Sequence, residues 1–124
     1  MKALKVNWHL SKMLIYLGIS PSNVGYRYIK EIIIHNTNND CQKLKDVYLT
    51  IARSYNQTPK LIEASVRNAI KRANNNDIHK RLESLMGKQI VNKNYSVTVA
   101  EFFGLMTTYL KYSWDGTDIV PAHD

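Results

Sequence analysis

The feature that most constrains this sequence is a pair of amphipathic segments joined by a short break, within residues 47–73. The apolar positions of the first segment recur at helical spacing and are Val47, Leu49, Ile51, Ala52 and Tyr55. The pattern stops at 56–58, where Thr58 is a good N-cap. Pro59 suits a first helical position, because proline has no amide proton to leave unpaired. The pattern therefore predicts two helices joined by a tight turn.

The second segment, 59–73, divides into an apolar face and a polar face. Spacings of three and four place on one face Ile62, Val66, Ala69, Ile70 and Ala73. The opposite face carries Lys60, Glu63, Ala64, Arg67, Asn68 and Lys71. An apolar helix, a short turn and a helix with such an outer face form a helix-turn-helix pattern, whose second helix reads base edges in the DNA major groove. We therefore expect 59–73 to be a recognition helix.

Individual side chains on this outer face have distinct expected roles. Arg67 has the forked geometry that reads guanine, and Glu63 can accept a hydrogen bond from a cytosine amino group. The alternative is that the two form a solvated ion pair, four residues apart on the helix. Residues expected to contact DNA phosphates are Thr58, Lys60, Lys71, Arg72 and Lys93. For Thr58 the alternative is a purely structural cap, and for Lys93 it is a solvated charge.

The charge of the chain agrees with a polyanionic partner. The formal net charge is +7 over 124 residues. All 17 Lys and Arg residues, but only seven of the ten Asp and Glu residues, lie within 1–112, so this part carries +10 and residues 113–124 are acidic. A basic body of this kind favours nucleic acid over a membrane as the partner.

Composition also bounds the class of protein. Apolar residues make up 44% of the chain, which is ordinary for a globular protein, and the length suits one domain with a core. Cys41 is the single cysteine, so no disulfide can form within the chain, as expected in a reducing compartment. No apolar run approaches the ~20 residues of a membrane helix. We expect a soluble cytoplasmic protein, associated with the nucleoid and without a membrane partner.

The N-terminal part of the chain predicts two further helices. The first is expected over 3–17, with Trp8 among its inward candidates, and Gly18 is placed to end it in a left-handed conformation. A serine-proline pair at 20–21 predicts the start of the second helix. The apolar stripe of that second helix is expected to include Val24.

The C-terminal part predicts two more helices around an ambiguous segment. Asp77 is placed to cap a short helix that stops at Gly87. Residues 88–97 fit either a small hairpin or an extended loop. Thr98 and Glu101 form a capping box, in which each side chain satisfies a backbone amide of the other residue, and this box starts the last helix.

Together these elements predict an all-α protein, a compact bundle of about six helices that contains the helix-turn-helix. We expect a single DNA-binding domain over 1–112. The remaining residues, 113–124, show no periodicity and are expected to form a flexible acidic tail.

Nothing in the sequence indicates catalysis. The four histidines lack the spacing of metal ligands, and they are His9, His35, His79 and His123. A glycine-rich phosphate loop, H-E-x-x-H and G-x-S-x-G are all absent from the sequence. We therefore expect no enzyme activity, no metal site and no cofactor.

Four blocks of sequence stand in a characteristic order, and they are LGISPSNVGYRYIKEII, IARSYNQTPKLIEASVRNAIKRA, LMG and TVAEFF. Together they resemble the C-terminal DNA-binding effector domain of the stage-zero sporulation protein A family of response regulators, from about Leu14 to Tyr112. The resemblance implies an all-helical bundle of six helices. It also implies double-stranded DNA as the partner, bound at short boxes in tandem, with a tandem homodimer on DNA and RNA polymerase as further candidate partners.

The chain departs from this family pattern on the recognition helix. The family reads its box with a Glu-Arg pair and another arginine one turn later. Glu63 and Arg67 match that pattern, whereas Ala64 stands where the middle arginine is expected. A missing arginine–guanine contact removes about 1–3 kcal/mol of discrimination. Asn68 stands in place of a family histidine and has the groups to read adenine.

A second departure concerns regulation. The family protein carries an N-terminal receiver domain whose aspartate is phosphorylated. The residues that precede Leu14 are too few for such a domain. We therefore expect constitutive activity, or control through the abundance of the protein, in place of phosphorylation.

Two classes of function follow from these patterns. The first is a sequence-specific transcriptional regulator that places helix 59–73 in the major groove of double-stranded DNA. The alternative is a protein-interaction module or antagonist that kept the fold and lost specific DNA binding. Ala64 favours the alternative, whereas Arg67 and the basic body favour the first class. A strong salt dependence of DNA binding is the expected sign of the first class, because displaced counterions produce it.

Overall fold

The computed structural model describes residues 2–39, 42–87 and 96–113, which form an all-α fold closed by a π-helical turn. The elements are α1 (Lys2–Tyr16), α2 (Val24–Asn38), α3 (Leu44–Tyr55), α4 (Pro59–Asn74), α5 (Ile78–Met86), α6 (Val99–Thr108) and the turn η1 (Tyr109–Ser113). The predicted fold class is confirmed, and the described residues contain no strand. Lys93, most of the ambiguous segment and the tail from residue 114 lie outside the described residues.

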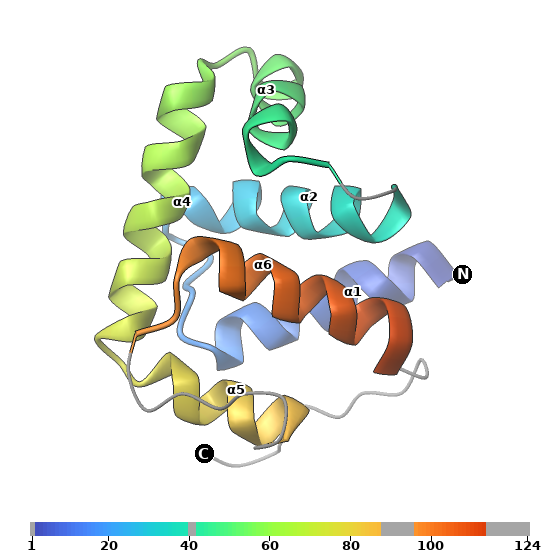
Figure 1. Ribbon diagram of the computed structural model, residues 1–124, viewed down its shortest axis with the longest axis vertical. Coiled ribbons are helices and arrows are strands. Elements are labelled where there is room, and N and C mark those ends of the chain that lie inside the picture. The colour runs from blue at the N-terminus through green and yellow to red at the C-terminus, as the bar shows by residue number, and fades with distance from the viewer. Residues whose placement is uncertain (1, 40–41, 88–95, 114–124) are drawn as a thin grey trace.

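Helix α4 runs along one edge of the molecule, and the other helices lie to one side of it (Figure 1). Helix α2 crosses the middle, with α3 at one end of the molecule and α5 at the other. Helix α4 packs most extensively against α2 and next against α3. This arrangement holds one long side of α4 in the core and leaves the opposite side facing away from the other helices.

The core that holds α4 is built from aliphatic side chains contributed by several helices. Leu14 of α1, Ile29 of α2, Ile62 of α4 and Leu82 of α5 are fully buried, and Phe102 of α6 is buried with them. Burying a side chain of this size contributes roughly 1.5–3 kcal/mol. Packing therefore fixes the position of α4 from its inner side.

Two predicted helix ends are confirmed in atomic detail. Gly18 adopts φ +94, and the amide of Ile19 donates to the carbonyl oxygen of Leu14 at 2.9 Å, which closes α1 in a Schellman motif. At the start of α6, the Glu101 amide donates to Thr98 Oγ1 at 3.1 Å. The Thr98 amide donates to Glu101 Oε1 at 2.9 Å, which completes the capping box.

One predicted helix start is wrong, and another is correct in position but lacks its predicted side-chain cap. Helix α2 begins after Asn23, whose Oδ1 accepts from the Gly25 amide at 2.8 Å, and the serine-proline pair at 20–21 lies in a preceding turn. Asp77 adopts a left-handed conformation, φ 60 and ψ 46, and its side chain makes no capping hydrogen bond to α5. Helix α5 still begins directly after Asp77, whose carbonyl oxygen accepts a hydrogen bond from the Lys80 amide at 3.1 Å.

Three side chains predicted to face the core are exposed instead. Trp8 is 67% exposed, Val24 68% and Leu49 43%. The Nζ of Lys12 lies 5.6 Å from the centroid of the Trp8 ring, so a neighbour on the same helix covers the ring in place of the core. Val24 is the first residue of α2 and precedes the point where that helix meets α4.

Candidate nucleic-acid interface

Helix α4 presents two faces of different character, as its sequence pattern predicted. The buried face consists of residues that are at most 2% exposed, and they are Ile62, Val66, Ala69, Ile70 and Ala73. The outward face consists of exposed residues, and they are Lys60, Leu61, Glu63, Ala64, Arg67, Asn68, Lys71 and Arg72. Every contact residue that the sequence predicted within α4 therefore lies on its solvent-facing side.

Gly25 of α2 sets how closely α4 is held. A Cβ added at Gly25 would overlap the carbonyl oxygen of Ser65 and would lie 2.9 Å from the Cβ of Ala69. Only a residue without a side chain allows the two backbones to approach this closely. The close approach of the two backbones fixes the orientation of α4 and hence the direction of its outward face.

The turn between α3 and α4 fixes where the outward face begins. Asn56 adopts the left-handed conformation, φ 53 and ψ 45, which asparagine tolerates better than most residues. Thr58 Oγ1 accepts a hydrogen bond from the Leu61 amide at 3.1 Å, and Pro59 occupies the first helical position. The predicted cap is confirmed, while the contact of Thr58 with a phosphate stays a prediction.

Glu63 and Arg67 are brought together as an ion pair, with Nη2 of Arg67 3.5 Å from Oε1 of Glu63. The side chains are 47% and 61% exposed, respectively, so the pair contributes little to the free energy of unfolding. The solvated ion pair that the sequence allowed is therefore present. Because water can replace either partner at little cost, the pair leaves both groups available to a base edge.

Tyr48 of α3 lies at the border between the core and this ion pair. Its side chain is buried, and that burial is the largest cause that raises the pKa of Tyr48 to about 12. The negative charge of Glu63 raises the pKa further, and the positive charge of Arg67 opposes it. The phenol of Tyr48 is therefore neutral at physiological pH. Spacing along the sequence could not show the electrostatic link of Tyr48 to α4, because the partners lie on different helices.

Further cations lie near the turn and were also missed in the sequence. The guanidinium carbon of Arg27, on α2, lies 5.9 Å from the centroid of the Tyr55 ring, at the end of α3. Tyr28 meets the same ring edge to face, with the centroids 5.1 Å apart. Arg53, in the last turn of α3, is exposed. Only a tertiary contact brings Arg27 to the turn, so no spacing within α2 could have marked it.

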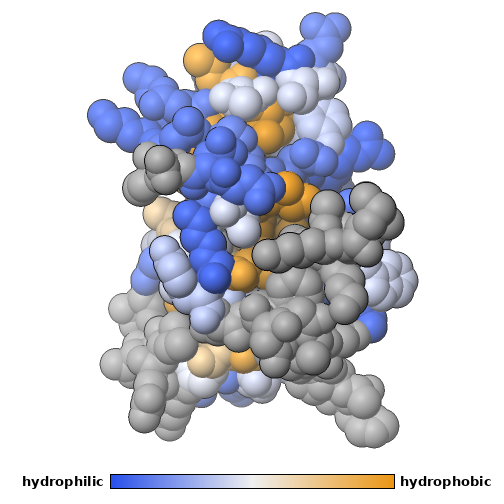
Figure 2. Space-filling view, turned by 90° about the vertical axis from the view of Figure 1, so that its right-hand side faces the viewer, coloured by the Kyte–Doolittle hydropathy of each residue, from blue (hydrophilic) through white to orange (hydrophobic). Residues whose placement is uncertain are grey.

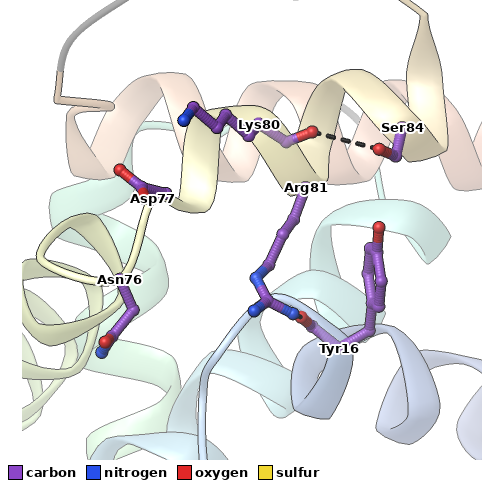
Figure 3. Close-up of a pocket in the computed structure, with 6 residues that line it drawn as sticks. All are labelled: Tyr16, Asn76, Asp77, Lys80, Arg81 and Ser84. Atoms are coloured by element: carbon purple, nitrogen blue, oxygen red, sulfur yellow. Dashed lines mark hydrogen bonds between the residues drawn. The ribbon is translucent and has the colours of Figure 1, made fainter. Parts of the chain in front are cut away.

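A separate polar pocket lies at the C-terminal end of α4, against α5 and the end of α1 (Figure 3). Its lining residues are Tyr16, Asn76, Asp77, Lys80, Arg81 and Ser84. Nη1 of Arg81 donates to the carbonyl oxygen of Tyr16 at 2.9 Å, and the guanidinium carbon lies 5.5 Å from the centroid of the Tyr16 ring. Arg81 therefore fastens α5 to α1, and the pocket lacks the apolar walls typical of cofactor sites.

The rest of the described surface offers neither a metal site nor a membrane span. Figure 2 views the side away from α4, where hydrophilic residues predominate near α3 and apolar residues show between them. Across residues 2–39, 42–87 and 96–113, no three His, Cys, Asp or Glu residues are grouped so that they could hold a metal ion. None of the described helices has the length and apolar character needed to cross a membrane.

Comparison with known families agrees with this geometry. A family model described as the sporulation initiation factor Spo0A C terminal matches residues 10–110 of the chain. The matched range contains α2 to α6 and the second half of α1, and so includes the complete unit of α3, turn and α4. It also contains Gly25, which positions α4.

Proposed function

The chain belongs to the Spo0A C-terminal family, and on that premise we propose that it is a sequence-specific transcriptional regulator that places α4 in the major groove of double-stranded DNA. The family is one of DNA-binding effector domains of a sporulation regulator and is not an enzyme family. The observation that carries the proposal is the outward face of α4. There Arg67, Asn68 and Lys71 are exposed together on a helix whose opposite face is fixed in the core.

Base reading is assigned to three side chains on this face. Arg67 would leave Glu63 and donate two hydrogen bonds to O6 and N7 of guanine, a contact worth about 1–3 kcal/mol of discrimination. Glu63 would then accept a hydrogen bond from a cytosine amino group, and Asn68 would pair with adenine. The exposed positions of all three residues support these roles.

Phosphate contacts are assigned to residues around the base-reading centre. Thr58 stands at the start of α4, where helix amides attract anions, and Lys60, Lys71 and Arg72 are exposed along the helix. Lys93, from the sequence alone, stays in this set. The exposed cations near the turn add Arg27 and Arg53 to it.

The proposal extends to assembly and to location. We propose that two copies bind in tandem on DNA and that RNA polymerase is a further partner, as the family resemblance implies. A domain over 1–112 would hold the DNA-binding surface, with the acidic residues 113–124 as an appended tail. With DNA as its partner, the protein would be located at the nucleoid in the cytoplasm.

The test is fluorescence anisotropy on a labelled duplex that carries a sporulation-type box, against a scrambled duplex, at two salt concentrations. Arg67→Ala is compared with Lys80→Ala, which removes the same charge from the pocket on α5. We expect the wild type and Lys80→Ala to prefer the box. We expect Arg67→Ala to lose about 1–3 kcal/mol of that preference.

Two other outcomes would change or overturn the proposal. Salt-sensitive binding without preference for this box would mean that Ala64 has moved the recognised site, and selection from a random duplex library would then identify it. Absence of binding to every duplex would overturn the proposal and favour the protein-interaction module.

A further inference from the structure

Two apolar side chains stand among the charges of the outward face of α4. Leu61 is 42% exposed and Ala64 is also exposed. They are three residues apart, so their side chains are neighbours on the helix surface. We call Leu61 and Ala64 the apolar strip.

The apolar strip lies on the side of α4 that faces away from the core. At about 100° per residue, Ala64 lies about 180° from the middle of the buried face. Leu61 lies one turn earlier, and Asn68 lies one turn later on the same side of the helix. Lys60, Arg67 and Lys71 flank the strip on its other side. In a duplex held by these cations, the edges of the bases would therefore lie against the apolar strip.

We propose that the apolar strip reads the 5-methyl group of thymine, which makes a thymine-containing step part of the recognised DNA site. This inference rests on the proposed function, since it requires α4 to lie in the major groove. The thymine methyl is the apolar group that a base pair presents in that groove, and alanine is among the residues that contact it. Covering the methyl with Leu61 and Ala64 removes apolar surface of both molecules from water.

The neighbouring residues agree with this assignment. Asn68 follows Ala64 by four residues, and its amide matches the N6 and N7 groups of adenine. An A·T pair offers adenine to Asn68 and a thymine methyl to the apolar strip across the same groove. Arg67, on the charged side, reads guanine independently. The outward face of α4 therefore divides into a guanine-reading half and a half that reads A·T pairs.

The experiment removes one methyl at a time. The tightest-binding duplex from a random library is synthesised with each thymine in turn replaced by deoxyuridine, and the dissociation constants are measured by anisotropy. For the wild type, replacement of one or two of the thymines is expected to weaken binding about fourfold. This factor corresponds to about 0.8 kcal/mol, the free energy of burying one methyl or methylene group. At the same thymines, Leu61→Ala and Ala64→Ser are expected to show less than a twofold loss.

Leu49→Ala is the matched control, because Leu49 is 43% exposed but belongs to α3. It is expected to keep the full deoxyuridine penalty. Tight binding without a penalty at any thymine would overturn methyl reading and leave the DNA-binding function intact. A penalty that persists unchanged in both Leu61→Ala and Ala64→Ser would also overturn it. Binding to no duplex would overturn the proposed function itself.

Discussion

The two faces of α4 place opposite demands on their residues. On the buried face, side chains from Ile62 to Ala73 are enclosed by α2, α3, α5 and α6. At Gly25 even one added carbon would overlap the backbone of α4. On the outward face, residues from Lys60 to Arg72 are exposed, and their one ion pair within the described residues is well solvated. The buried face therefore constrains the volume and shape of its side chains, whereas the outward face is defined by the polar groups that its side chains carry.

This difference predicts that substitutions on the two faces separate in what they change. A change on the buried side alters the free energy of unfolding, because interiors are close-packed and accommodate extra volume poorly. A change on the outward side leaves the free energy of unfolding within about 0.5 kcal/mol and alters DNA affinity.

The largest effect is expected for Gly25→Ala. The added Cβ meets a backbone carbonyl of α4, which cannot rotate away as a side chain can, so α2 and α4 must move apart. We expect a loss of about 3 kcal/mol in the free energy of unfolding, at the upper end of the range for an overpacked core. Urea denaturation followed by circular dichroism measures it.

Gly104→Ala is the matched control, because a Cβ added there has open space around it. Gly104 lies within α6, where alanine is the better helix former, so a gain of about 0.5–1 kcal/mol is expected. Equal effects of the two substitutions would contradict the close approach of α2 and α4.

The sequence could predict features that depend on nearby residues, but it could not predict the role of Gly25. The two faces of α4, its cap at Thr58 and the capping box at Thr98 follow from residue spacing, because each depends on neighbours within four residues. The role of Gly25 depends on Ser65 and Ala69, in a distant part of the chain.

The same limit applies to the candidate site. The order of residues in the chain cannot show that the charges of Glu63 and Arg67 act on Tyr48, because these residues lie on different helices. It cannot bring Arg27 to Tyr55 either. The start predicted at 20–21 was wrong because a serine-proline pair also suits the turn that is observed there. Local pattern therefore identified α4 and its two faces, whereas the contacts that position α4 are tertiary.

A smaller effect is expected for Thr58→Ala, at the junction between the two faces. The substitution removes the acceptor of the Leu61 amide and should cost about 1 kcal/mol of the free energy of unfolding. Thr58→Ser keeps a hydroxyl and should stay close to the wild type. Urea denaturation of both variants measures the cost.

Thr98→Ala provides the comparison, because it removes a similar cap from α6. Both alanine variants should lose similar stability, but only Thr58→Ala should also weaken DNA binding. Unchanged DNA affinity in folded Thr58→Ala would show that Thr58 is a structural cap alone.

On the outward face, Lys71→Ala is expected to leave the free energy of unfolding unchanged and to weaken DNA binding for all sequences alike. A phosphate contact carries no sequence information. Its loss should reduce the slope of log K against log salt concentration by about 1. Anisotropy titrations at four salt concentrations measure the slope. A loss confined to one sequence would instead make Lys71 a base reader.

The smallest effect at neutral pH is expected for Tyr48→Phe, which lies between the two faces. Because the pKa of Tyr48 is raised to about 12 from an ordinary value of 10, the unfolded chain loses this proton first as the pH rises. The resulting stability is complete below pH 10 and is lost between pH 10 and 12. Urea denaturation from pH 7 to 11.5 should therefore show a shallower alkaline loss in Tyr48→Phe than in the wild type. Tyr112→Phe, at an exposed tyrosine, should retain the wild-type profile. Identical profiles for Tyr48→Phe and the wild type would contradict the raised pKa of Tyr48.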